Sequence, residues 1–396
     1  PSPARAHGGP PPRGAAADIL TSAWGQKAGI YHPAPAAASA EEVVSKWLLD
    51  LLRLPPTSSV ACSTGATMAS FICLSAARSE VLHRAGYDLE ENGIIGAPSI
   101  NVILGKEAHA TIHSDLRYLG FGRKHLIEVD VDEQGRMLAS DFAKKISACT
   151  GPTIVITQAG HINSGAFDPF NEIIPLAKQH NAWVHVDGAF GLWACAVPHL
   201  AAYAEGLEHA DSWTVDGHKW LQVPYDSGFA IIKDELAHRR AMDITASYLV
   251  KDADDGRNPS SYAPELSRRA RGFAAWAVLQ SLGRHGVIDM IDRHCRCVKH
   301  LAQKLESIPG IHIHNDVVIN QLALSFGPDD SLDQRNALTE RVIQAIRKEN
   351  RNFVLGATWK NQTILRISVI SRLTDITDMD DLADSILRAW SSVSNN

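Results

Sequence analysis

Short apolar segments alternate with segments of helix length through the middle of the chain, and this order constrains the fold more than any other feature. Helices are expected near 109–119, 140–149 and 170–180. The predicted strands are NVIL at 101–104, LIEVDV at 126–131, TIVIT at 153–157, AWVHVD at 182–187, SWTV at 212–215 and GFAII at 228–232. Because strands separated by helices form βαβ units, the pattern predicts an α/β fold whose mostly parallel sheet is flanked by helices.

The C-terminal part predicts a second, smaller α+β domain. A long helical stretch over roughly 265–308 precedes the order strand-strand-helix-strand-strand-helix, in which three strands are IHIHN at 311–315, NQLALSF at 320–326 and ILRISVI at 364–370. We expect three parts: an N-terminal arm and helix over 1–50, a large domain over 51–290 and a small domain over 291–396. A chain of 396 residues can build cores for two such domains without metal or disulfide support.

The N-terminal segment is expected to be a linker or extended arm over residues 1–16, because Pro, Gly and Ala dominate it. The first residue is proline, so we expect the natural N-terminus to be missing or processed. Ser39 followed by Glu42 has the spacing of a capping box, which predicts a helix that begins there and stops before Pro55. The turn Ser63-Thr64-Gly65-Ala66-Thr67 then leads into an apolar helix.

Composition excludes several classes of function. The net charge is -6, without the basic patch that binds nucleic acid or anionic lipid, and no apolar run is long enough to span a bilayer, which predicts a soluble chain. The six cysteines have neither the density of a disulfide framework nor the spacing of a zinc site, so we expect reduced thiols in a cytoplasmic protein and no metal. They are Cys62, Cys73, Cys149, Cys195, Cys295 and Cys297.

Two residues predict the chemistry. Asp187 ends a buried strand, and ligands of open α/β sheets bind at the carboxyl ends of the strands. Lys219 follows 32 residues later, in the segment Asp216-Gly217-His218-Lys219-Trp220. Taken singly, the acid is typical of a turn and the lysine of a surface charge. Together they are the groups that pyridoxal 5'-phosphate (PLP) requires, since a lysine forms the Schiff base and an acid keeps the pyridine nitrogen protonated.

The sequence resembles the group II PLP-dependent amino acid decarboxylases of fold type I, from about residue 17 to the C-terminus. The resemblance implies a PLP cofactor, a small amino acid substrate and a homodimer with the site at the interface. The motifs that carry it are HVDGAFG, ADSWTVDGHKWLQVPYDSG, SRRARGFAAWAVLQSLGRHGV and QAGHINSGAFDPF.

The resemblance also implies roles for individual residues. Lys219 would form the Schiff base and Asp187 would hold the pyridinium, while Ala189 would lie against one face of the ring. His109 would stack on the other face, with His113 as the competing choice and a helix cap as the structural alternative. The remaining cofactor-binding residues would be Gly65, Ala66 and Thr67 at the phosphate, His218 beside the lysine, and Gln158.

Some positions depart from the family pattern. His161 stands where many relatives carry Thr or Asn, with a surface-loop histidine as the alternative. The polar stretch over 251–267 matches a mobile lid, and its Tyr262 is a hypothetical proton donor, although it lies closer to Arg268 than the family pattern predicts. Arg271 and Arg366 are candidates for carboxylate or phosphate contacts, and structural ion pairing explains them equally well.

The most specific interpretation is a decarboxylase that converts an L-amino acid to an amine and carbon dioxide through Lys219. Other PLP reactions remain alternatives: oxidative decarboxylation to an aldehyde, transamination or C–C lysis. A non-catalytic protein with this fold is a further alternative, which the joint presence of Asp187, His218 and Lys219 disfavours.

Overall fold

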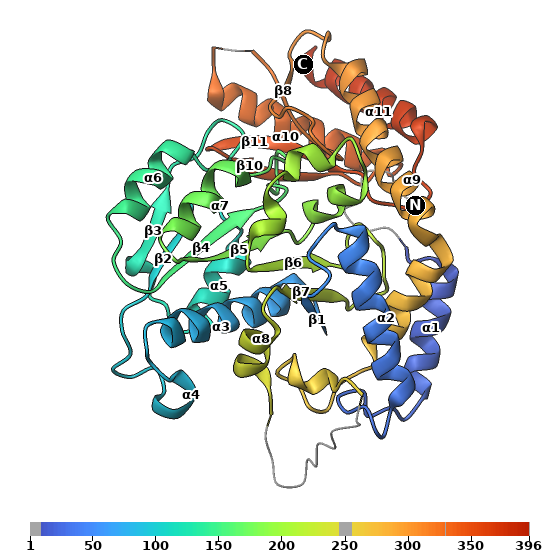
Figure 1. Ribbon diagram of the computed structural model, residues 1–396. Coiled ribbons are helices and arrows are strands. Elements are labelled where there is room, and N and C mark those ends of the chain that lie inside the picture. The colour runs from blue at the N-terminus through green and yellow to red at the C-terminus, as the bar shows by residue number, and fades with distance from the viewer. Residues whose placement is uncertain (1–8, 245–255, 329, 396) are drawn as a thin grey trace. The chain divides into compact units, whose positions relative to one another are not determined.

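The computed structural model describes residues 9–244, 256–328 and 330–395 (Figure 1). The chain forms two compact units. The large unit contains residues 10–159 and 167–285, and the small unit contains residues 160–166 and 286–395. The expected division of the chain near residues 50 and 290 stays a prediction.

A seven-stranded sheet forms the centre of the large unit, as the strand pattern predicts. β7 is antiparallel to both of its neighbours, and the strands from β6 to β3 are parallel. In sheet order the strands are β1 (Ser59–Ser63), β7 (Gly228–Ile232), β6 (Ser212–Asp216), β5 (Trp183–Asp187), β4 (Thr153–Gln158), β2 (Asn101–Gly105) and β3 (Leu126–Val129). All five residues of β5 are buried, because helices cover both faces of the sheet.

Helices α3 and α5 lie on one face of this sheet, and α6 and α7 lie on the other (Figure 1). α3 is buried along most of its length, and its apolar side chains share a core with Ile154, Ile156 and Trp183 of the sheet. The helices of the large unit are α1 (Pro12–Ala23), α2 (Pro35–Leu51), α3 (Ala66–Arg84), α4 (Leu89–Asn92), α5 (Ala110–Tyr118), α6 (Ala139–Ser147), α7 (Phe170–Gln179) and α8 (Glu235–Met242).

Two predictions for the N-terminal region are wrong. Residues 12–16 belong to α1 and not to an extended arm, because Pro12 at a first helical position needs no N–H partner; residues 1–8 of that prediction lie outside the described residues. The capping box at Ser39 does not form. α2 begins at Pro35, four residues earlier, and Ser39 lies inside the helix.

The small unit contains a four-stranded antiparallel sheet, and the predicted order of its elements is confirmed. Leu322, Leu324 and Phe326 of the sheet pack against apolar side chains of α10 and α11. Its strands, in sheet order, are β10 (Leu355–Trp359), β11 (Gln362–Ser368), β9 (Gln321–Phe326) and β8 (Ile311–Ile313). Its helices are α10 (Leu332–Lys348) and α11 (Ile376–Ser394), while α9 (Arg271–Leu305) belongs to both units and kinks at Gly283. Within residues 9–244, 256–328 and 330–395, no helix has the length and apolar character needed to cross a membrane.

Candidate active site

Polar side chains end three neighbouring parallel strands of the large unit. β4 ends at Gln158, β5 at Asp187 and β6 at Asp216. Gln158 pairs in register with Asp187, so the three residues share the carboxyl edge of the sheet. Asp187 is 7% exposed, and its Oδ1 accepts a hydrogen bond from the Ala189 amide at 3.1 Å. This edge is where an open α/β sheet binds ligands.

Lys219 is held by a carboxylate to which the sequence analysis gave no role. Its Nζ lies 2.9 Å from Asp216 Oδ2, and the Asp216 side chain is 2% exposed. The other oxygen, Oδ1, accepts a hydrogen bond from the Ala66 amide at 2.6 Å. Asp216 therefore connects Lys219 to the first turn of α3. The sequence feature that could have pointed to Asp216 is its position at the end of a predicted strand, three residues before Lys219.

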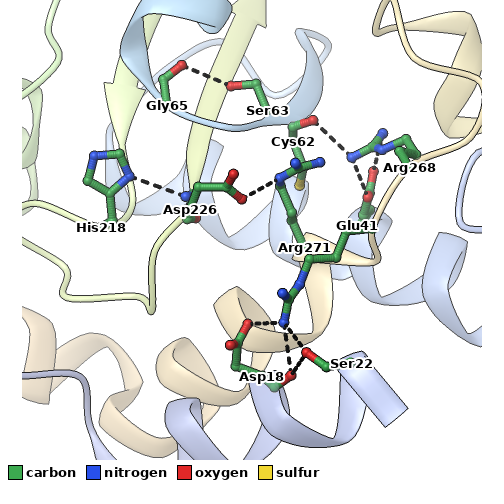
Figure 2. A network of polar contacts seen from close by, with 12 residues as sticks. Asp18, Ser22, Glu41, Cys62, Ser63, Gly65, His218, Asp226, Arg268 and Arg271 are labelled. Carbon is green, nitrogen blue, oxygen red and sulfur yellow. Dashed lines mark hydrogen bonds and ion pairs between the residues drawn. The ribbon is translucent and has the colours of Figure 1, made fainter. Parts of the chain in front are cut away.

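The turn before α3 is shaped by two glycines. Gly65 is the N-cap of α3 and has no side chain to cap the helix, and Ser63 Oγ donates to the Gly65 carbonyl at 3.1 Å (Figure 2). A Cβ at Gly65 would lie 3.0 Å from His218 Cε1 and 3.3 Å from Asp216 Oδ1. A Cβ at Gly228 would lie 2.5 Å from the Gly65 backbone. Glycine at both positions lets the turn approach β7 and the lysine segment closely.

His218 has defined neighbours beside Lys219. Its Nδ1 accepts a hydrogen bond from the Ser227 amide at 3.2 Å, and its Nε2 lies 3.6 Å from Asp216 Oδ1. Its ring stacks on Tyr225 with a centroid separation of 4.1 Å. These contacts fix the ring next to the turn at Gly65.

His109 is the N-cap of α5, as the structural alternative predicted. Its Nδ1 accepts a hydrogen bond from the Thr111 amide at 3.3 Å. The same side chain also lines a small cavity together with Ile112, Gln158 and Asp187. The competing residue, His113, is not among the residues that line this cavity. The fold thus brings His109 to Asp187 and Gln158 while its capping bond fixes the ring.

Tyr262 is packed inside the large unit. It is 5% exposed, its hydroxyl donates to Glu235, and its carbonyl accepts from His238 Nε2 at 2.8 Å. The Arg257 guanidinium lies 3.7 Å from the ring centroid, and burial raises the pKa of the phenol. These contacts run to α8 and to Arg257, and none of them reaches Lys219. Residues 251–255 of the predicted lid lie outside the described residues.

The other flagged residues have structural partners. Arg271 Nε donates to Asp226 Oδ1 at 2.8 Å (Figure 2). Within the small unit, Arg366 donates to the Ile162 carbonyl at 3.5 Å, and burial lowers the pKa of its guanidinium. His161 of the same unit is 2% exposed, so it is not a surface-loop histidine, and its Nδ1 accepts from the Ser164 amide at 3.3 Å.

A buried ion pair supports the strand that leads into the Gly65 turn. Arg268 Nη2 donates to Glu41 Oε1 at 2.8 Å and to the Cys62 carbonyl at 2.9 Å (Figure 2). The two side chains are 1% and 2% exposed, and burial raises the pKa of Glu41. The pair connects α2 to the end of β1.

The chemistry of these groups fits PLP. Lys219 offers a primary amine with a 30% exposed side chain, and Asp187 offers a carboxylate at a strand end. The amides of Thr67 and Met68 begin α3 without a side-chain cap, which suits a phosphate. Among the described residues, no three or more His, Cys, Asp or Glu side chains are grouped so that they could hold a metal ion. Fold and site together define a PLP-dependent enzyme with the fold type I architecture.

Comparison with known proteins identifies the family. The family model described as "Pyridoxal-dependent decarboxylase conserved domain" matches residues 12–326, so the chain belongs to this family. An aromatic-L-amino-acid decarboxylase of Bacillus atrophaeus is 25% identical over 378 residues, which cover 92% of this chain and 76% of the relative. An L-2,4-diaminobutyrate decarboxylase of Rhizobium meliloti (strain 1021) is 30% identical over 300 residues, which cover 74% and 57% of the two chains.

A solved structure supports the fold. The crystal structure of Oryza sativa TDC with PLP and tryptamine superposes with a TM-score of 0.90 at 20% identity, covering 97% of this chain and 82% of that one. The predicted fold type I architecture is confirmed. The family assignment makes the protein a PLP-dependent carboxy-lyase that acts on an amino acid.

Proposed function

We propose that this chain removes the carboxylate of an L-amino acid as carbon dioxide and releases the amine, with Lys219 as the residue that forms a Schiff base with PLP. One observation carries the proposal. Lys219 Nζ lies 2.9 Å from a buried carboxylate that also accepts from the first amide of α3. The same sheet edge carries Asp187 on the adjacent strand.

Bound PLP withdraws the electrons that remain on Cα when carbon dioxide leaves. Asp187 is suited to hold the proton at the ring nitrogen, since one of its oxygens is already fixed by the Ala189 amide. Ala189 and His109 are suited to lie against the two faces of the ring, and Gln158 lines the same cavity as His109.

The phosphate is expected to bind at the start of α3. The amides of Thr67 and Met68 and the exposed Thr67 hydroxyl are its donors, with His218 beside them. The Ala66 amide already donates to Asp216, so the phosphate meets two amides and not three.

Asp216 is suited to exchange a proton with Lys219. The amine has to be neutral to react with a carbonyl carbon, and the Asp216 oxygen at 2.9 Å is positioned to take its proton. The hydrogen bond from Ala66 keeps the carboxylate oriented while it does so.

The attachment of the cofactor is tested by borohydride reduction of the purified protein, followed by peptide mapping. We expect the pyridoxyl label on Lys219, its loss in Lys219→Ala, and its retention in Lys233→Ala, a control at an exposed lysine. A label on another lysine, or no chromophore after addition of PLP, contradicts the proposal.

The reaction is tested by product analysis with aromatic amino acids and 2,4-diaminobutyrate, the substrates in the names of the relatives above. We expect amine and carbon dioxide in equal amounts. One relative, 23% identical, is named 4-hydroxyphenylacetaldehyde synthase, so aldehyde, ammonia and peroxide are measured in the same samples. Their formation, or that of a keto acid, assigns a different PLP reaction.

We also propose a homodimer in the cytoplasm. Exposed apolar side chains on and after α1 support a dimer: Ile19, Leu20 and Trp24 are 70%, 50% and 48% exposed. The six free cysteines support a reducing compartment. Analytical ultracentrifugation and cell fractionation test the two proposals, and a monomer or an exported protein contradicts them.

A further inference from the structure

A second buried carboxylate, Asp115, lies on α5 near the candidate site and has no role in the proposed function. It is 0% exposed and follows Ile112, a cavity-lining residue, by three positions, while Leu116 beside it is also buried. Neither Asp115 oxygen accepts a hydrogen bond from any residue in the described part of the chain. An ionised carboxylate in such a place is strongly disfavoured, so Asp115 requires a proton or a charge partner.

No positive charge contributes to the pKa of Asp115, which is raised by burial and by the charge of Asp187. Arg78 of α3 donates to the Leu119 carbonyl at the end of α5, at 2.8 Å. On β5, His185 is fully buried, its Nε2 has no partner among the described residues, and burial lowers the pKa of the imidazole to about 3. On α3, burial raises the pKa of the Cys73 thiol to about 12, with a further contribution from the charge of Asp115. Both groups are therefore neutral at pH 7.

The remaining titratable groups on α5 and at its N-cap are His109, His113, Arg117 and Tyr118. His109 caps the helix, and Arg117 is exposed with its guanidinium 5.1 Å from the centroid of the Tyr118 ring. His113 is half-buried and stands two positions before Asp115, on a different side of the helix.

Asp187 is the charged group that acts on the pKa of Asp115. Burial, and then the charge of Asp187, raise the pKa of Asp115 to about 8. Asp187 has an amide donor at 3.1 Å and Asp115 has none, so Asp115 is the member of the pair whose ionised form is disfavoured. At neutral pH Asp115 holds a proton.

We propose that Asp115 is a positioning residue that holds this proton in the empty enzyme and gives it up to solvent when the protonated ring of PLP binds beside Asp187. The inference rests on the proposed role of Asp187. The pyridine nitrogen of free PLP already carries a proton in neutral water, so the ring enters as a cation. The O–H bond of Asp115 then breaks, its proton passes to solvent, and Asp115 becomes a carboxylate. The net charge of the buried group is the same before and after. The positive ring also removes the repulsion between Asp115 and Asp187.

The test counts protons by calorimetric titration of the apoprotein with PLP at pH 7, in Pipes and in Hepes, whose heats of ionisation differ. Because Asp115 gives up its proton when the ring binds and asparagine has no acidic proton to lose, we expect the wild type to release close to one proton more per bound PLP than Asp115→Asn. Asp141→Asn is the matched control, since Asp141 pairs with Lys145 on α6, and it should give the wild-type count. Equal counts for wild type and Asp115→Asn overturn the inference.

A second measurement needs no variant. In protein labelled with carbon-13 at the aspartate side chains, the infrared band of a protonated carboxylic acid should disappear when PLP binds, and an unchanged spectrum overturns the inference. The failure of the proposed function looks different: the wild type then shows no PLP chromophore and no binding heat.

Discussion

The buried pair between Glu41 and Arg268 gives the sharpest prediction of stability. Glu41→Gln keeps the size of the side chain but removes the charge that faces Arg268 at 2.8 Å, where both side chains are at most 2% exposed. The guanidinium then remains buried without a counter-charge. Breaking such a pair costs about 3–5 kcal/mol of the free energy of unfolding. With a urea m-value of roughly 3 kcal/mol/M, the unfolding midpoint should fall by about 1 M or more.

A neighbouring ion pair provides the matched control. Arg269 Nη2 lies 2.5 Å from Asp18 Oδ1, but the two side chains are 35% and 26% exposed. Solvent screens this pair, so Asp18→Asn should cost less than about 1 kcal/mol. The double variant Glu41→Leu with Arg268→Met should recover most of the loss, because an apolar pair leaves no buried charge. The reasoning fails if Glu41→Gln is no more destabilising than Asp18→Asn in urea titrations followed by circular dichroism.

Four further predictions concern the site and the pH dependence. Lys219→Ala should abolish the PLP chromophore; retained absorbance after dialysis would contradict the assignment. Gly228→Ala should weaken PLP binding at least tenfold in a fluorescence titration, because its Cβ would lie 2.5 Å from the Gly65 backbone, whereas Gly25→Ala, where a Cβ meets nothing within 4 Å, should match the wild type. Tyr262→Phe should cost about 1 kcal/mol of stability through the lost bond to Glu235 and leave the product unchanged; a switch from amine to aldehyde would instead make Tyr262 the proton donor. Burial lowers the pKa of His185, His238 and His294 to about 3, below the value of about 6.5 in an unfolded chain, so unfolding takes up protons between these values. Stability should therefore fall as the pH drops from 6.5 toward 3, by at most about 1.4 kcal/mol per pH unit for each histidine, and a flat urea midpoint over that range would refute it.

The strand and helix pattern could be predicted from the sequence because it depends on local periodicity. Segments such as TIVIT and AWVHVD are mostly apolar, as is typical of strands buried on both faces, and they form β4 and β5 as predicted. The position of Asp187 at a strand end and the segment around Lys219 were visible in the same way. Local signals also misled: the Ser39 spacing suits a capping box, yet the helix starts at Pro35.

Contacts between distant segments were not predictable. β1 is a strand because it pairs with β7, which lies about 170 residues further along the chain, and nothing within SVACS requires that partner. The bond between Asp216 and Ala66 joins residues 150 positions apart. His109 carries both a capping bond and a place in the cavity beside Asp187, two roles that the sequence presented as alternatives.

By itself, the sequence determined the class of fold, the lysine and acid of the site and the resemblance to one enzyme family. These follow from residue types at short spacings. Only the tertiary structure decided that Lys219 pairs with Asp216, that Tyr262 binds Glu235, and that Asp115 lies buried without a donor near Asp187. The physical reason is that burial and charge at each of these groups depend on side chains from other strands and helices, which local sequence does not specify.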